Sequence, residues 1–431
     1  MRILIITHLI PYPLSEGGRI SQYALIDYLR KKCAITLLLF IYNERDASSV
    51  IHLKEVWRDV AFETISFLPV GTLTSKRTPK SLLKSGMAAV LHKGSQLFDK
   101  HLVEKPINDK ADRDGIMHMI DFVNLKSRSV IDQISAIIKK CSPTLIQVEF
   151  IYLLDLVYSL PKEIKKIFVH HELRFTRFNE IQSNESAAYR DYLTGMCTLN
   201  EVEVLKHYDA VLTLGEYETA LLKDRMATQN IYTSPFSVLD ADITNTNEIG
   251  ADIQKLVFVG GELHPPNRDA VAWYIQEMGK EMYSKYNLAL HVIGHWTEET
   301  KRLHSNNKAV YFTGYIEDIK AYCKYSVMLV PMRLGGGIRT KILYGMAWGV
   351  PVISTTIGSS GIVHSNAGTI LANTADEFKI GIAKLLADKP FQHALINKAQ
   401  LIIKANYTQE IAGEKRYDIY KNVVQDVHFT L

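Results

Sequence analysis

The chain has 431 residues, which is more than one ordinary hydrophobic core organises, so two domains are expected. Apolar residues at 47%, charged residues at 22% and a net charge of +4 are typical of a soluble globular protein and argue against a nucleic-acid-binding chain. The four cysteines are far apart, without the spacing of a zinc site or a disulfide framework, which fits a reducing cytoplasm.

The N-terminal residues predict a strand, a glycine loop, a helix and a second strand, which is how a doubly wound α/β sheet begins. The strands are expected at 2–7 and 35–42, and the helix at 21–30. Gly17 and Gly18 stand in the loop and are interpreted either as a plain turn or as a ligand-facing loop. The first strand is too short for the apolar part of a signal peptide, and no run of about 18 apolar residues predicts a membrane-spanning helix.

A basic segment follows residues 57–70, which are poorly periodic. Between 76 and 105 there are seven Lys and Arg residues against only Asp99 and Glu104, which gives a local charge of +5. Apolar residues interleave with the basic ones at helical spacing. The segment 76–105 is therefore interpreted either as a surface helix that meets anionic lipid or as a solvated helix with one stripe facing the core.

Two adjacent histidines, His170 and His171, end a strand expected at 166–169. Because neighbouring strand residues point to opposite faces, the two rings are not expected to chelate one metal ion. One of them is expected at the carboxyl edge of the sheet, where open α/β folds bind ligands, or else to be satisfied by loop backbone. Further elements of this half are expected at 130–140, 144–150, 179–206, 210–214 and 217–226.

Residues 237–255 are rich in Asp, Asn and Thr and poor in apolar residues, so they predict a linker. Domains are therefore expected at 1–240 and 241–405, with 406–431 packing back on the N-terminal domain. Two such domains side by side leave a cleft between the carboxyl edges of their sheets. The second series is expected as strands at 255–260, 288–293, 309–312, 327–330, 351–354 and 369–371, and helices at 267–278, 316–323, 338–347, 375–386, 395–405 and 409–424.

The stretch from 327 to 362 predicts a strand, a loop of three glycines, a helix and another strand. Gly335, Gly336 and Gly337 let the backbone approach a ligand closely or adopt positive φ. Free N–H groups and the positive end of the helix dipole favour an anion there. Arg339 and Lys341 fall in the expected first turn, where cations are disfavoured unless an anion is bound, although Arg339 could also simply point to solvent. The stretch therefore predicts a phosphate-binding site.

Several common enzyme motifs are absent from the sequence. None of the three glycine loops matches GxxxxGK[ST] or a GxGxxG followed by an acid about 20 positions later. No GxSxG elbow, HExxH or close pair of acids indicates a hydrolase. The residues alone thus indicate a two-domain α/β protein that binds a phosphorylated, nucleotide-linked ligand in its cleft.

Four stretches of the C-terminal half carry a resemblance to a known family: FVGGELHPPNRDAVAWY (258–274), LHVIG (290–294), VYFTGYIEDIKAYC (310–323) and VPMRLGGGIRTKILYGMAWGVPVISTTIGSSGI (330–362). The N-terminal half matches more loosely, through RILIIT, LIQVEF and HHEL. With these stretches the chain resembles the retaining GT-B glycosyltransferases of family 4, most closely in its C-terminal half. The resemblance implies two Rossmann-like domains facing across a cleft, and an enzyme of EC class 2.4 that transfers a sugar from a nucleotide-diphosphate sugar without a metal.

The resemblance also assigns donor-side roles. The loop from Gly335 to Ile338 would present backbone N–H groups to the donor phosphates, and Gly260 and Gly261 would bind on the same side. Arg339 or Lys341 would offset the charge of the departing diphosphate.

On the N-terminal side, the resemblance puts His171 near the donor sugar and Gly17 and Gly18 near the acceptor.

The sequence departs from the family pattern at Tyr344. The family usually has KILEAMA, whose glutamate binds the ribose hydroxyls, whereas this chain has KILYGMA. The upstream acid falls on Gly336, as in relatives with GxGxR loops. A phenol accepts hydroxyls less well than a carboxylate, so Tyr344 binds the nucleotide itself, is replaced by another group, or marks weak or lost donor binding. We favour retained activity because the phosphate loop and its cations survive.

The leading hypothesis is a cytoplasmic glycosyltransferase of surface polysaccharide or glycolipid synthesis. It would use a UDP- or GDP-sugar and a glycan or lipid-linked acceptor, and would reach the inner membrane face through 76–105. The alternative is a catalytically silent GT-B protein that binds a ligand or partner, and Tyr344 favours it. An epimerase of the same fold is a third, but the carboxylates it needs are not identified. The sequence does not give the donor base, the sugar, the acceptor, the linkage or the oligomeric state.

Overall fold

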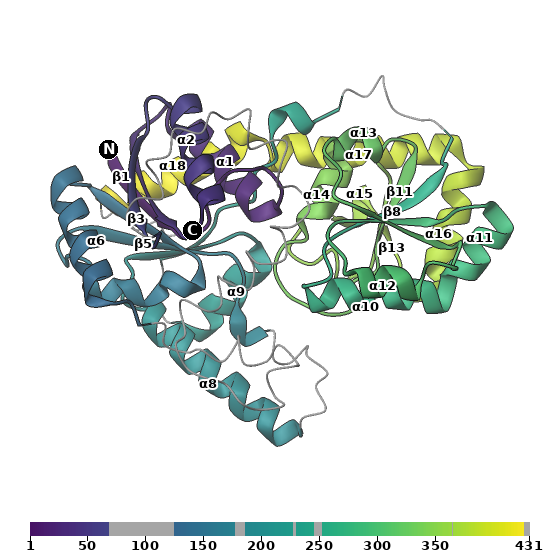
Figure 1. Ribbon diagram of the computed structural model, residues 1–431, viewed down its shortest axis with the longest axis horizontal. Coiled ribbons are helices and arrows are strands. Elements are labelled where there is room, and N and C mark those ends of the chain that lie inside the picture. Colours follow the sequence, from purple (N-terminus) through teal and green to yellow (C-terminus); the bar gives the residue numbers. More distant parts are fainter. Residues whose placement is uncertain (69–124, 177–185, 227–229, 245–251, 364, 426–431) are drawn as a thin grey trace.

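The computed structural model describes residues 1–68, 125–176, 186–226, 230–244, 252–363 and 365–425. Within these ranges two sheets stand side by side, each with helices packed on it (Figure 1). The first has the strand order β3-β2-β1-β4-β5-β6-β7 and the second β10-β9-β8-β11-β12-β13. The described strand pairings in both sheets are parallel. The prediction of two doubly wound α/β domains is therefore confirmed.

The first half alternates strands with helices. Its strands are β1 (Arg2–Thr7), β2 (Ala34–Ile41), β3 (Ala61–Ser66), β4 (Leu145–Glu149), β5 (Lys165–His170), β6 (Ala210–Thr213) and β7 (Ile231–Thr233). Its helices are α1 (Gly17–Leu29), α2 (Glu44–Val56), α6 (Arg128–Cys141), α8 (Ala187–Leu205) and α9 (Glu216–Arg225), with short 3-10 segments at Ile151–Ser159 and Asp240–Asp242.

The second half repeats this alternation and ends in three helices. Its strands are β8 (Lys255–Val259), β9 (Leu290–Ile293), β10 (Val310–Gly314), β11 (Ser326–Val330), β12 (Val352–Ser354) and β13 (Ile370–Leu371). Its helices are α10 (Pro265–Tyr274), a π-helical turn at Ile275–Gly279, α11 (Lys280–Tyr286), α12 (Glu298–Leu303), α13 (Ile319–Tyr322), α14 (Thr340–Ala347), α15 (Ser365–Gly368), α16 (Ala375–Ala387), α17 (Lys389–Asn406) and α18 (Gln409–Gln425).

The first sheet is buried on both faces, as its alternating side chains show. Leu4 and Ile6 of β1 belong to one hydrophobic core, whereas Ile3 and Ile5 belong to the core on the opposite face. This is the pattern of a parallel strand covered by helices on both sides. The second sheet has one continuous core.

Two predictions about residues 57–105 need comment. Residues 57–70 contain β3, an edge strand that sequence periodicity does not reveal because most of its side chains are exposed or half-buried. The basic segment 76–105 lies outside the described residues. No helix in the described ranges is long and apolar enough to cross a membrane.

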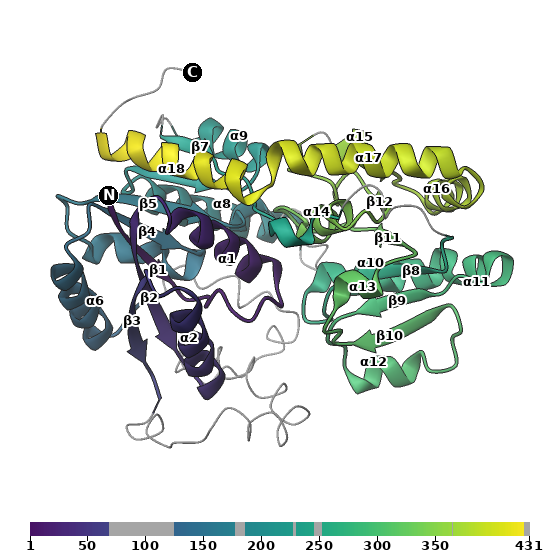
Figure 2. The same cartoon turned by 90° about the horizontal axis from the view of Figure 1, so that it is seen from above.

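The last helix crosses from the second sheet to the first. Figure 2 shows α17 alongside α14 and α15, and α18 continuing over the N-terminal half, where it packs on α1. Ala412, Ile419, Tyr420 and Val423 of α18 belong to the same core as β1 and α1. Side chains that are distant in sequence thus share one core, so α18 is part of the N-terminal packing unit in this structure.

We expect Gly413→Ala to destabilise the protein, because a Cβ there would overlap the ring of Tyr28 on α1. Forcing the two helices apart should cost about 1–3 kcal/mol. Thermal unfolding measures the effect. Gly195→Ala on α8 is the matched control: nothing lies within 4 Å of the added carbon, so better helix propensity should raise the midpoint slightly. Equal midpoint changes in the two variants would contradict close packing of α18 on α1.

Candidate functional site

The glycine loop after β11 contains two residues with left-handed backbone angles. Gly335 has a φ of 96° and Gly337 a φ of 77°, a region that favours glycine. The helix α14 then begins at Thr340, not at Ile338 as predicted. The prediction was wrong because Arg339 has a ψ of 89° and is not helical. Arg339 therefore precedes the first turn of the helix instead of lying in it.

The side chain of Arg339 folds back over this loop. Its Nη1 donates to the carbonyl oxygens of Gly336 and Gly337, and its Nη2 donates to that of Leu334 at 3.2 Å. Arg339 is only 8% exposed, so the alternative that it points to solvent is wrong. The guanidinium group thus holds the loop in shape and brings a positive charge to it.

Lys341 lies in the first turn of α14, next to the other donor-side loop. Its Nζ donates to Oδ1 of Asn267 at 2.9 Å and lies 4.1 Å from the centroid of the Phe258 ring. Asn267 in turn donates from Nδ2 to the carbonyl oxygen of Gly261 at 2.9 Å. Burial, together with the charge of Arg339, lowers the pKa of Lys341 to about 7. These hydrogen-bonding and ring partners are neutral, so an anion bound here would stabilise the ammonium form.

Parts of the N-terminal half meet this donor-side cluster. A Cβ on Gly337 would lie 3.6 Å from the carbonyl oxygen of His171, which follows β5. A Cβ on Gly17, at the start of α1, would overlap the side chain of Thr340. The structure therefore brings together residues that are far apart in sequence and that were predicted for opposite sides of one cleft.

The remaining predicted glycines lie at the margins of this cluster. A Cβ on Gly18 would be 3.9 Å from Cζ of Phe150. Gly260 and Gly261 follow β8, and Gly261 connects to Lys341 through the amide described above.

His171 is held by two neighbours at the carboxyl edge of the first sheet. Its Nε2 lies 3.1 Å from Oε2 of Glu149, and its ring stacks on Phe150 with centroids 3.8 Å apart. His170 pairs instead with Glu201 at 2.5 Å. The two histidine rings therefore have different acidic partners. The side chain of His171 is 16% exposed.

Sequence analysis missed Glu149 and Asn267. Glu149 is 4% exposed at the end of β4, and the available signal was a carboxylate closing an apolar run. Burial alone would raise the pKa of Glu149, but the pKa is lowered, and the hydrogen bond from His171 and the charge of Arg416 are among the causes. The signal for Asn267 was a polar side chain just after Pro-Pro at a helix start, close behind the Gly260-Gly261 pair.

Tyr344 belongs to the core of the second domain. It is 5% exposed, its ring contacts Phe236 and Trp348, and burial, with a smaller contribution from Asp242, raises its pKa well above the usual value. Within the described residues its hydroxyl has no hydrogen-bond partner. The structure thus gives no support for a phenol that faces the nucleotide. The side chain of Ile338 also packs against this core, partly buried.

Residues 253–388 match the family model described as Glycosyl transferases group 1. A search of curated proteins finds no match.

Several solved structures are similar over nearly their whole length. TarM of S. aureus is 10% identical, with a TM-score of 0.63, and the match covers 97% of this chain and 99% of that chain. HepE of Anabaena is 11% identical, with a TM-score of 0.61 and coverage of 98% and 100%. Sucrose-phosphate synthase of Thermosynechococcus elongatus is 15% identical, with a TM-score of 0.66 and coverage of 99% for both chains.

At these identities the structural likeness shows the fold, and the predicted GT-B fold is confirmed. The family match confirms the predicted enzyme class at the level of a glycosyltransferase, while the assignment to family 4 stays a prediction. Residues 253–388 of this chain form a glycosyl transferases group 1 domain, carried on a two-domain GT-B fold.

Proposed function

We propose that the protein is a retaining glycosyltransferase of family 4 that moves a sugar from a UDP- or GDP-sugar to an acceptor hydroxyl. The observation that carries the proposal is the environment of Lys341, which has no ion-pair partner in the described ranges and is tied through Asn267 to a second glycine loop. A diphosphate is the anion that such a cation and a glycine loop bind. HepE was solved with UDP-glucose and TarM with UDP, which supports a nucleotide-sugar donor.

The proposed reaction breaks the bond between the anomeric carbon of the donor sugar and the diphosphate oxygen. It forms a bond from that carbon to the acceptor oxygen, whose proton passes to the departing diphosphate. Negative charge then develops on the leaving diphosphate, and Lys341 and Arg339 offset it. In this proposal these cations take the place of a metal ion. His171 approaches the donor sugar from the N-terminal side, because its carbonyl lies beside Gly337.

The proposal about the acceptor is supported by the sequence and by the fold. We propose a lipid-linked or polysaccharide acceptor near Gly17 and Gly18, and a cytoplasmic enzyme that reaches the inner membrane face. TarM was solved with alpha-GlcNAc-glycerol, a glycan-type compound. The segment 76–105, proposed to meet anionic lipid, lies outside the described residues.

Lys341→Met should weaken binding of UDP or GDP by about tenfold or more, because one ion pair with the diphosphate is lost. Isothermal titration calorimetry of the full chain with each nucleotide measures this. Lys404→Met, an exposed change on α17 of the same domain, should leave the affinity unchanged.

The same titration separates the two hypotheses. If neither UDP nor GDP binds at millimolar concentration, the enzyme proposal is contradicted. Binding without transfer or hydrolysis across a panel of nucleotide sugars would favour the catalytically silent alternative.

Nucleotide affinity should fall as the pH rises above about 7. The free protein has a Lys341 pKa of about 7, and a bound diphosphate raises it, so above this value binding must take up a proton. The second pKa of a phosphate is about 6, so UDP itself is fully ionised at pH 8. Titrations in buffers of different ionisation enthalpy at pH 8 should show proton uptake. A Lys341→Met variant with equal uptake would assign the proton to another group.

Tyr344→Phe should keep nucleotide binding and should not destabilise the protein. The lost hydroxyl has no partner within the described residues, so its removal should be neutral or stabilise by about 1 kcal/mol. Tyr407→Phe is the matched control, because the Tyr407 hydroxyl accepts the backbone N–H of Val363 at 2.8 Å, and its loss should destabilise. A several-fold loss of UDP affinity in Tyr344→Phe would show that the Tyr344 hydroxyl contributes to nucleotide binding.

A further inference from the structure

Arg416 of α18 is a cation buried inside the N-terminal domain. It is 2% exposed, although it comes from the last helix of the chain. Its Nε donates to Oγ of Ser234 at 2.6 Å, and its Nη1 donates to Oε1 of Gln147 at 3.3 Å. Neither partner is charged. Since an uncompensated buried cation is costly, its negative counterpart has to lie further along this network.

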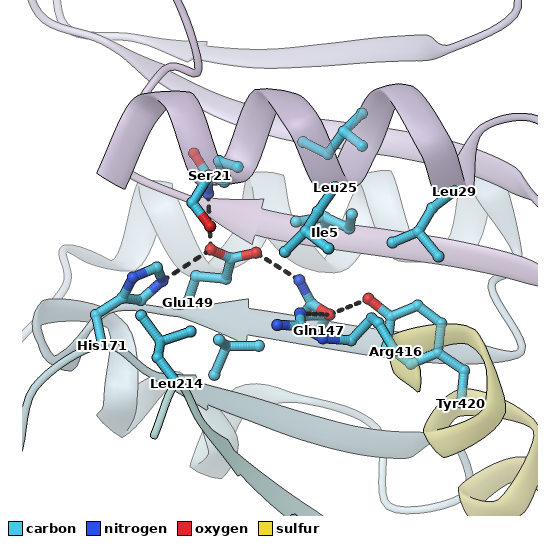
Figure 3. Close-up of a pocket in the computed structure, with 13 residues that line it drawn as sticks. Ile5, Ser21, Leu25, Leu29, Gln147, Glu149, His171, Leu214, Arg416 and Tyr420 are labelled. Atoms are coloured by element: carbon cyan, nitrogen blue, oxygen red, sulfur yellow. Dashed lines mark hydrogen bonds and ion pairs between the residues drawn. The ribbon is translucent and has the colours of Figure 1, made fainter. Parts of the chain in front are cut away.

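Gln147 of β4 connects that cation to a carboxylate. Its Oε1 accepts from Arg416 and from the hydroxyl of Tyr420, while its Nε2 donates to Oε1 of Glu149. Figure 3 shows Gln147 between Glu149 and the α18 side chains Arg416 and Tyr420. The two ends of the amide therefore match the two charges: the carbonyl faces the cation and the amino group faces the anion. A flipped amide would oppose both charges.

Glu149 in turn orients His171. Among the residues that the structure describes, its carboxylate receives three donors: Gln147 on Oε1, and Nε2 of Gln22 at 2.8 Å and Nε2 of His171 at 3.1 Å on Oε2. An ionised carboxylate can only accept, so Nε2 of a neutral His171 carries the proton. The other ring nitrogen, Nδ1, is then left as an acceptor for a ligand hydroxyl.

The small cavity at this network is not a substrate pocket. Its polar lining includes Gln22, Gln147, Glu149, His171 and Arg416, and its volume of about 10 Å³ has room for about one water molecule. A sugar or nucleotide does not fit there. The network therefore acts on the cleft through His171.

His8 does not supply a competing charge to Glu149. Burial lowers the pKa of His8 to about 3, so His8 is neutral at physiological pH. Tyr420 is a neutral donor, since burial raises its pKa. Arg416 is thus the permanently charged cation whose field favours the ionised form of Glu149.

We infer that Arg416 is a positioning residue: through Gln147 it keeps Glu149 ionised, and Glu149 holds His171 in the Nε2–H form that presents Nδ1 to the cleft. The C-terminal helix thereby completes the site of the N-terminal domain. The role of His171 beside the donor sugar rests on the proposed function. The contacts that connect Arg416, Gln147, Glu149 and His171 do not depend on that function.

The test is a pair of NMR measurements on the full chain without any ligand. Carboxyl ¹³C shifts follow the titration of Glu149, assigned with Glu149→Gln, and ring ¹⁵N shifts report the tautomer of His171, assigned with His171→Gln. The wild type should show Glu149 titrating below its ordinary pKa, and Nε2–H on His171. Arg416→Met should raise the pKa of Glu149 by about one unit and mix the two His171 tautomers. Lys415→Met, an exposed change beside it, should match the wild type.

A folded Arg416→Met variant with wild-type titration and tautomer would overturn the inference. If circular dichroism shows that this variant does not fold, Gln147→Met provides the same test, because it interrupts the connection and leaves both charges in place. Unchanged signals in that variant would also overturn it. Absence of nucleotide binding in the calorimetric titration would contradict the proposed function. It would not change the Glu149 titration or the His171 tautomer, which are measured without ligand.

Discussion

The two domains approach each other closely at glycines, where the backbone carries no side chain. Gly17 at the start of α1 meets Thr340 at the start of α14, and a Cβ on Gly336 would lie only 3.0 Å from Oγ1 of Thr176. Glycine at these points lets the carboxyl edges of both sheets come together. The cations of the second domain and His171 of the first depend on that approach, because neither domain contains the whole cluster.

Buried charges on the two sides of the cluster are compensated in different ways. On the N-terminal side, the charges of Arg416 and Glu149 are connected by an amide whose orientation matches both. On the donor side, Lys341 has a neutral amide partner and a second cation, Arg339, nearby. Charges with a built-in counterion support structure, whereas a cation without one in the described ranges favours binding an anion. This difference separates the framework of the site from its ligand-binding part.

The fold and the glycine loops could be predicted because their signals are local. Buried parallel strands are short apolar runs, and the three glycines at 335–337 mark a strand-to-helix turn wherever they occur. The direction of the Arg339 side chain could not be predicted, since it depends on which loop carbonyls remain unpaired after folding. The contact of Arg416 with Gln147 spans 269 positions and depends on how α18 crosses the molecule. The sequence pattern did not predict edge strand β3 for a related reason. This strand is formed by pairing with β2, and its own residues do not show a strand pattern.

The position of Tyr344 in the structure gives a different interpretation of the missing glutamate in the family pattern. In the sequence it replaces an acid expected to grip ribose, but in the structure its ring completes a core with Phe236 and Trp348. A carboxylate is still present at the glycine loop: Glu218 of α9 is 6% exposed, and burial raises its pKa while the Gly337 N–H and the charge of Arg339 oppose that rise. The acidic side chain at this loop therefore comes from the other domain. A loop whose acid belongs to the other domain is complete only when the two domains are together, so its properties depend on the same close approach that glycine allows.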